Sequence, residues 1–263
     1  MKPQVLFIHG MWSRPWVWTQ WRGLFEEVGY SCTAIALPGH AEGEADSALE
    51  NKGLADYVDA VMRTAVQFER PILIGHSMGG WIAQQVASRM SLSAAVLVNS
   101  AAPAPIFPLR PVTLPGTFRT FATWALWRKA FRLSRWEADY LIFTALPEEE
   151  KAACFAGLIA ESGRVAYQLG FGSLNLAGSN RVDRDKIACP MLALSGARDR
   201  IVPVGASRRM SAWYGERLDY REYPEHAHWM LGEPGWQARA AETLAWLEGL
   251  GVKQPAPKVM PLS

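Results

Sequence analysis

Short apolar runs alternate with amphipathic stretches along most of this chain, and this alternation limits the folds that it can adopt. The compact apolar runs, which we expect to be buried strands, are residues 5–8, 32–37, 71–75, 94–98 and 191–194. The stretches with apolar side chains at helical spacing are residues 16–28, 54–68, 78–90, 203–214 and 235–249. Buried strands that alternate with helices predict an α/β fold with a mostly parallel sheet and helices on both faces. A more polar run at 217–223 suits an edge strand.

The alternation stops between Pro103 and Lys186, over roughly 80 residues. Prolines first forbid regular structure there, and a mostly helical, aromatic segment follows over residues 118–136. Because the strand pattern returns at Pro190, we expect residues 103–186 to form a helical lid inserted into one core of residues 1–102 and 187–250. The proline-containing tail, residues 251–263, is predicted to be disordered.

A G-x-S-x-G pattern at residues 75–79 lies between the strand that ends near Ile74 and the helix that begins near Trp81. In this context the pattern predicts a sharp turn that raises the hydroxyl of Ser77 above the carboxyl edge of the sheet. Side chains at Gly75 and Gly79 would collide with neighbouring backbone. Ser77 is therefore the candidate nucleophile, and the N–H of Met78 is a candidate donor to a developing oxyanion.

A serine hydroxyl needs a base to take its proton, and the base needs a carboxylate to orient it. His226 and His228 both follow the last predicted strand, and Asp199 follows the strand before it. Both loops open at the same edge of the sheet as Ser77. The order of serine, aspartate and histidine along the chain is the one that α/β-hydrolases use.

From residue 4 to about 250 the chain resembles the α/β-hydrolase superfamily, with a layout similar to that of plant methylesterases and hydroxynitrile lyases. The matching segments are His9-Gly10, Leu37-Pro38-Gly39-His40, the Ser77 turn, Asp199 with Val202-Pro203, and the histidine loop with Glu233-Pro234. The resemblance implies an α/β-hydrolase fold. It also implies that His228, which follows Ala227 and precedes Glu233, is the catalytic histidine, and that Met11 supplies the second oxyanion N–H. His226 is then a residue of the loop or of the pocket rim.

Tryptophan is abundant, with 12 copies, and four of these are expected to line a large apolar substrate pocket: Trp12, Trp124, Trp127 and Trp229. On a continuous helix, Trp124, Trp127 and Phe131 would share one side, and most of the nearby basic residues would lie off that side. We interpret this as a lid helix that turns its aromatic side chains inward. A helix that lies on a membrane surface is the less favoured alternative.

Composition excludes several classes of protein. With 27 basic and 25 acidic residues the net charge is +2, which provides no electrostatic footprint for nucleic acid. No apolar run approaches the about 18 residues of a membrane span, and the first apolar run is too short for a signal peptide. The three cysteines are widely separated, so we expect no disulfide and a cytoplasmic protein. The H-x-H pair has no third ligand nearby, so we expect no metal site and no cofactor.

The sequence thus predicts a serine hydrolase, a carboxylesterase that cleaves hydrophobic or bulky esters, lactones or thioesters through an acyl-enzyme. The predicted partner is a small hydrophobic ester-like molecule. Other chemistry on the same fold is the alternative: a C–C bond hydrolase, a perhydrolase or a biosynthetic cyclase. Trp229 stands where hydroxynitrile lyases have lysine, which argues against cyanohydrin cleavage. A ligand-binding, receptor-like protein on this scaffold is a further, less favoured alternative.

Overall fold

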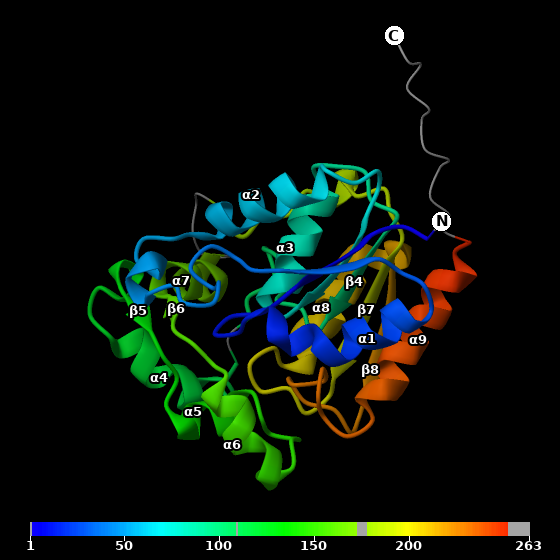
Figure 1. The fold of residues 1–263 in the computed structure, drawn as a ribbon. Coiled ribbons are helices and arrows are strands. Elements are labelled where there is room, and N and C mark those ends of the chain that lie inside the picture. Colours follow the sequence, from blue (N-terminus) through cyan, green and yellow to red (C-terminus); the bar gives the residue numbers. More distant parts are fainter. Residues whose placement is uncertain (1, 109, 173–177, 252–263) are drawn as a thin grey trace.

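A six-stranded parallel sheet runs through the centre of the molecule, in the order β2-β1-β3-β4-β7-β8 (Figure 1). The computed structural model describes residues 2–108, 110–172 and 178–251. The strands of this sheet are β1 (Val5–Ile8), β2 (Cys32–Ile35), β3 (Ile72–His76), β4 (Ala94–Val98), β7 (Met191–Gly196) and β8 (Leu218–Tyr223). The predicted α/β class is confirmed, and the polar run forms the edge strand β8, as expected.

Helices cover both faces of the sheet because the strands are apolar on both sides. In β1, Leu6 and Ile8 pack toward α2, α3 and α8, whereas Val5 and Phe7 pack toward α1 and α9, and all four side chains are fully buried. These helices are α1 (Thr19–Glu27), α2 (Leu54–Ala65), α3 (Met78–Ala87), α8 (Val204–Tyr214) and α9 (Trp236–Gly249). Short 3-10 turns are η1 (Pro15–Trp18), η2 (Asp46–Leu49), η5 (Arg184–Lys186) and η6 (Gly215–Arg217).

The chain between β4 and β7 forms a separate group of short elements, drawn mainly in green in Figure 1 and called the insertion below. They are α4 (Leu114–Ala122), η3 (Leu126–Arg128), β5 (Ala130–Phe131), α5 (Arg135–Leu141), α6 (Glu148–Ala156), β6 (Glu161–Ser162) and α7 (Gly163–Phe171). Strands β5 and β6 pair antiparallel.

The continuous helical segment expected over residues 118–136 is not formed. Helix α4 ends at Ala122, and Ala125 adopts a left-handed backbone with φ +54°. An L-residue in that conformation cannot continue a right-handed helix, so the helical phase is lost before Trp127. Side-chain directions deduced from an unbroken helix therefore do not apply to this segment.

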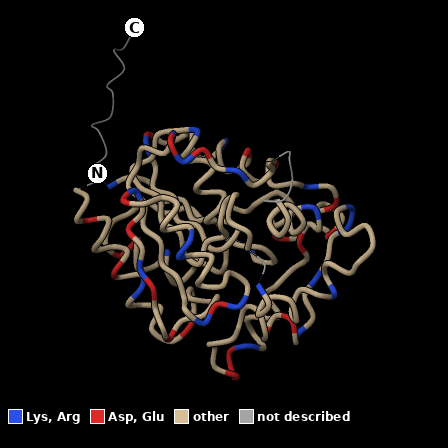
Figure 2. Tube along the Cα trace, turned by 180° about the vertical axis from the view of Figure 1, so that it is seen from behind, with Lys and Arg blue, Asp and Glu red and all other residues tan. Residues whose placement is uncertain are grey.

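Charged residues of both signs are spread over the trace (Figure 2), in keeping with the small net charge. Among the described residues, no helix has both the length and the apolar character needed to cross a membrane. The predicted disordered tail lies outside the described residues beyond Gly251.

Candidate active site

Ser77 occupies a tight turn between strand β3 and helix α3. Its backbone has φ +54° and ψ −118°, a conformation that few non-glycine residues adopt and that stores strain. A Cβ on Gly75 would overlap the carbonyl oxygen of Gly79, and a Cβ on Gly79 would overlap that of Ile8. Close backbone packing therefore requires both glycines of the motif, and the turn holds Ser77 at the carboxyl edge of the sheet.

A buried carboxylate and a buried imidazole meet on two neighbouring loops at this edge. Asp199 follows β7, His228 follows β8, and Asp199 Oδ2 lies 2.7 Å from His228 Nδ1. The other carboxylate oxygen accepts hydrogen bonds from the N–H groups of Ile201 and Val202, at 2.9 and 2.8 Å. Burial raises the pKa of Asp199, and these hydrogen bonds oppose the rise. Since an ionised carboxylate accepts, His228 donates through Nδ1, which leaves Nε2 free to take a proton.

Two side chains outside the predicted set hold the backbone of His228. Asn99 follows β4, and its Nδ2 donates to the carbonyl oxygens of Ala227 and His228, at 2.7 and 3.0 Å. Its Oδ1 accepts the N–H of Gly196 at 2.7 Å, so Asn99 ties the histidine loop to the end of β7. His76 Nε2 also donates to the His228 carbonyl, at 2.8 Å. A polar residue directly after a buried apolar strand is the sequence signal that could have identified Asn99.

The ring of His76 is uncharged, which matters because it lies 4.7 Å from the ring of His228, measured between centroids. Burial, and next the proximity of His228, lower the pKa of His76 to about 3. At neutral pH the ring of His76 therefore adds no positive charge beside His228.

Glu233 organises the loop that carries both candidate histidines. Its buried carboxylate accepts the N–H groups of Ala227 and Trp229, at 2.8 and 3.0 Å. His226 Nδ1 lies 3.1 Å from the same carboxylate, and His226 is 1% exposed. His226 is thus directed toward Glu233, whereas His228 is directed toward the carboxylate after β7.

Two backbone N–H groups beside Ser77 are free to donate hydrogen bonds to a ligand. A Cβ on Gly10 would lie 3.0 Å from Ser77 Cβ, so the loop after β1 packs against the serine and places Met11 on the same cavity wall. Met78 is the first residue of α3, where backbone N–H groups have no partner inside the helix. Among the described residues, neither of these N–H groups donates to a protein acceptor.

An apolar cavity lies between Ser77 and the insertion. It holds about 730 Å³ of empty space, a volume that includes its open mouth. Its lining includes Met11, Trp12, Phe131, Leu141, Ile201 and, from α4, Thr117, Thr120 and Phe121. Within the described ranges, no charged side chain lines it.

The structure describes all four tryptophans that were predicted to line the pocket, and it brings Trp12 to the cavity but not the other three. Trp124 and Trp127 are 83% and 42% exposed, because the helix that would have turned them inward is interrupted at Ala125. Trp229 is buried and packs against the rings of Trp16 and Phe143.

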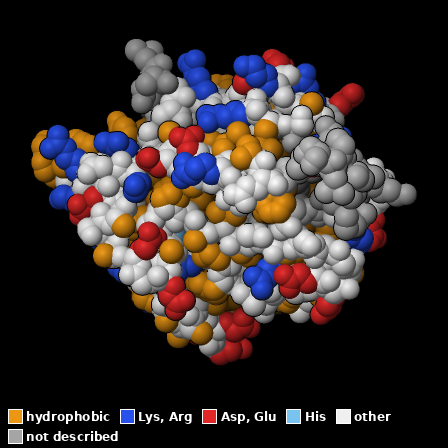
Figure 3. Space-filling view, turned by 45° about the horizontal axis from the view of Figure 1, so that its top comes forward, with side chains coloured by type: hydrophobic (Ala, Val, Ile, Leu, Met, Phe, Trp, Pro, Cys, Tyr) orange, Lys and Arg blue, Asp and Glu red, His pale blue; other side chains and the backbone are white. Residues whose placement is uncertain are grey.

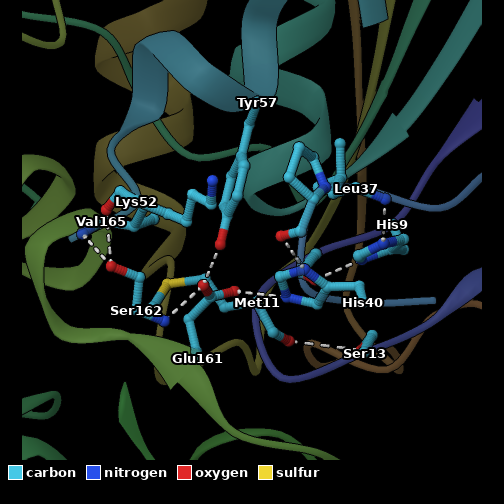
Figure 4. Close-up of polar contacts among 12 residues, drawn as sticks. His9, Met11, Ser13, Leu37, His40, Lys52, Tyr57, Glu161, Ser162 and Val165 are labelled. Atoms are coloured by element: carbon cyan, nitrogen blue, oxygen red, sulfur yellow. Dashed lines mark hydrogen bonds and ion pairs between the residues drawn. The ribbon is translucent and has the colours of Figure 1, made fainter. Parts of the chain in front are cut away.

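A glutamate from the insertion is buried against the core (Figure 4). Glu161, in β6, is 0% exposed, and its Oε2 lies 3.1 Å from Nε2 of the equally buried His40. Its Oε1 accepts the hydroxyl of Tyr57 at 2.7 Å and the N–H of Ser162 at 2.6 Å. These four residues, called the Glu161 cluster below, connect the insertion to the loop after β2 and to α2.

The Glu161 cluster continues to the loop that carries Met11. The rings of His40 and His9 lie 4.9 Å apart, and His9 Nδ1 donates to the carbonyl of Gly10 at 2.8 Å. On the other side of the loop, the N–H of Ile159 donates to the carbonyl of Trp12 at 2.8 Å. The loop beside Ser77 is therefore held from both the core and the insertion.

No group of three or more histidine, cysteine or carboxylate side chains suited to a metal ion occurs in the described part of the chain. In particular, His226, the first histidine of the H-x-H pair, contacts the carboxylate of Glu233, which also accepts backbone N–H groups.

The sequence profile of the alpha/beta hydrolase family matches residues 5–240 of this chain. A Mycoplasma pneumoniae protein provisionally named an esterase/lipase is 36% identical over 97 residues, which cover 35% of this chain and 36% of that protein. The match thus spans about a third of that relative.

Two solved structures share the fold over nearly the whole chain. A methylesterase from Arabidopsis has a TM-score of 0.72 at 14% identity, covering 94% of this chain and 99% of that chain. Tomato methylketone synthase I, complexed with 2-tridecanone, has a TM-score of 0.73 at 13% identity, covering 95% and 99%. At these identities the likeness concerns the fold.

Proposed function

Because this chain belongs to the alpha/beta hydrolase family, we propose that it is a serine hydrolase that cleaves carboxylic esters of apolar substrates, with Ser77, His228 and Asp199 as its catalytic residues. The esterase names carried by one relative and one structural neighbour support an ester as the bond that is cleaved. Lactones and thioesters are close variants of the same chemistry.

One observation carries this proposal: a strained serine turn faces an apolar cavity at the sheet edge where Asp199 and His228 form a buried pair at 2.7 Å. Nucleophile, base and orienting carboxylate come from three separate strand ends. A structural role alone would not require the positive φ of Ser77 or two unbonded N–H groups next to it.

The proposed reaction begins when Ser77 Oγ attacks the ester carbonyl carbon and His228 Nε2 takes the hydroxyl proton. The carbonyl oxygen becomes an oxyanion and accepts hydrogen bonds from the N–H groups of Met11 and Met78. The C–O bond breaks, and the alcohol leaves with the proton from His228. Water then attacks the acyl-enzyme with His228 as base, which releases the carboxylic acid and restores Ser77.

The cavity supports an uncharged, hydrophobic substrate. Its walls carry hydroxyl groups from threonines and otherwise apolar side chains, so a charged group inside it would lose hydration without gaining a partner. Trp12 and Phe131, whose rings make an edge-to-face contact, supply an aromatic wall. We therefore favour an acyl group that is alkyl or aromatic.

A panel of p-nitrophenyl esters of increasing acyl length, each assayed with the wild type and with Ser77→Ala, tests the proposal. We expect turnover of apolar esters by the wild type and a loss of about 10³-fold or more in Ser77→Ala. A fluorophosphonate probe should label the wild type and not the variant. Equal rates with both proteins, together with no labelling of Ser77, would refute the proposed function.

A further inference from the structure

Large aromatic side chains stand out into solvent at the tip of the insertion. Phe118 is 74% and Trp124 is 83% exposed, and Leu114 and Trp127 are exposed as well. The ring of Trp127 contacts those of Trp124 and Tyr167, with centroids 6.4 and 6.2 Å apart. We call these five side chains the aromatic tip.

Helix α4 contributes side chains both to the cavity and to the aromatic tip. Thr117, Thr120 and Phe121 line the cavity, while Leu114 and Phe118 project from other positions of the same helix into solvent. A single surface helix normally keeps one polar face, so apolar side chains outside the core-facing stripe need a second apolar environment.

Basic residues flank the aromatic tip. Residues 103–136 contain six arginines and lysines and no aspartate or glutamate. Arg119, Arg132 and Arg135 form ion pairs with carboxylates. Arg128 and Lys129, adjacent to Trp127, are exposed and have no ion pair within the described residues. Figure 3 shows hydrophobic and basic side chains gathered at its left edge, where Figure 1 places β5 and the loop before it.

We propose that the aromatic tip docks on an anionic lipid surface, with Phe118 and Trp124 inserted at the headgroup level and Arg128 and Lys129 against the lipid phosphates. Tryptophan and phenylalanine beside arginine and lysine are the composition that favours the membrane interface. Negative headgroups supply the counter-charge that these two basic residues lack. The binding is independent of ester cleavage and would place the helix that covers the cavity at the lipid surface.

Charge argues against a second copy of this chain as the occupant of the tip. A symmetric dimer through this surface would bring Arg128 and Lys129 of both copies together without intervening carboxylates, which is repulsive. Phe118 and Trp124 are also more than 70% exposed, which leaves both rings accessible for insertion into a lipid interface.

Sedimentation with vesicles tests the proposal on the full chain carrying Ser77→Ala, so that hydrolysis plays no part. The vesicles are phosphatidylcholine alone and phosphatidylcholine mixed with phosphatidylglycerol. We expect binding to the mixed vesicles to be about tenfold tighter or more, and to weaken as salt is added. A double variant, Phe118→Ser with Trp124→Ser, should lose about tenfold in binding, as should Arg128→Glu with Lys129→Glu.

Trp136→Ser is the matched control, because Trp136 is an exposed tryptophan of the insertion outside the tip, stacked on Tyr140. It should bind as the parent does, and unchanged melting temperatures would show that all variants are folded. The proposal is overturned if anionic and neutral vesicles bind alike, if neither binds, or if Trp136→Ser loses as much as the tip variants. Self-association that the tip variants abolish, with no vesicle binding, would instead identify a dimer surface.

Discussion

Replacing Glu161 by alanine is expected to lower the free energy of unfolding by about 3–5 kcal/mol, the cost of removing one partner from a buried charged pair. Its carboxylate accepts hydrogen bonds from His40, Tyr57 and Ser162, and Glu161 and His40 are both 0% exposed. Without the carboxylate, three donors lose their acceptor in a space closed to solvent. For a chain of this length the melting temperature should fall by about 6–20 °C.

The pH dependence of stability provides a sharper test of the same cluster. His40 faces an acceptor at each ring nitrogen, the carbonyl of Pro38 at 3.2 Å and Glu161 at 3.1 Å, so the imidazolium form satisfies both. Burial lowers the pKa of His40, but the Glu161 carboxylate outweighs burial and the pKa is raised overall. This contribution to stability is complete below the unfolded pKa of about 6.5 and is lost as pH rises through the raised value.

Glu161→Gln should remove this loss, since an amide carries no charge to hold the proton on His40. The neighbouring His9 does not obscure the effect: burial, and next His40, lower its pKa well below the usual value, so His9 changes stability only as pH falls below about 6.5. Urea unfolding followed by circular dichroism between about pH 6 and 9 measures the difference between the wild type and Glu161→Gln.

Glu148→Gln is the control, because Glu148 is an exposed glutamate of the insertion that pairs with Lys151 at the surface. It should leave the pH profile unchanged. A stabilising charged pair of Glu161 and His40 is refuted if Glu161→Ala is as stable as the wild type, or if Glu161→Gln shows the same fall in stability with rising pH.

Three further predictions concern the candidate site and its turn. Asp199→Asn should lower kcat on a p-nitrophenyl ester by about 10⁴, the size of this effect in another triad enzyme; a loss of less than tenfold would exclude Asp199 as the orienting carboxylate. His228→Ala should abolish turnover while His226→Ala keeps most of it, and the reverse result would exchange the two assignments. Gly79→Ala should destabilise the protein by about 3 kcal/mol or more, since its Cβ overlaps backbone, whereas Gly23→Ala, in helix α1 with no atom within 4 Å, should stabilise it by about 0.5–1 kcal/mol. Chemical denaturation measures both, and equal effects would contradict the packing argument.

Much of the core could be predicted because a buried strand requires a run of consecutive apolar residues, which can be recognised in the sequence. The apolar run at residues 5–8 is strand β1 without change, and the run at 32–37 differs from β2 by its last two residues. The polar run near the end of the core is an edge strand, since β7 is the one strand that pairs with it among the described residues. The order of the strands in the sheet was beyond such reasoning, because it depends on contacts between segments distant in the chain.

The insertion shows where helical periodicity fails. The expected inward direction of Trp124 and Trp127 assumed one helix, but α4 ends at Ala122 and the backbone reverses hand at Ala125. A two-residue strand, β5, then follows in place of a helix. The conformation of short irregular elements depends on the surface on which they pack. The helix and strand propensities of the segment itself do not predict that conformation.

The turn at Ser77 was determined by the sequence itself, because its two glycines and the strand and helix around it are contiguous and their sterics are local. The same is true of the buried strands, because consecutive apolar side chains indicate their burial. Only the tertiary structure decided that Glu161 meets His40, 121 residues away, that Asn99 holds the loop of His228, and that the tip aromatics face solvent. Each of these contacts depends on how segments distant in the chain pack together. Whether a polar side chain has a hydrogen-bond partner is decided only by that packing.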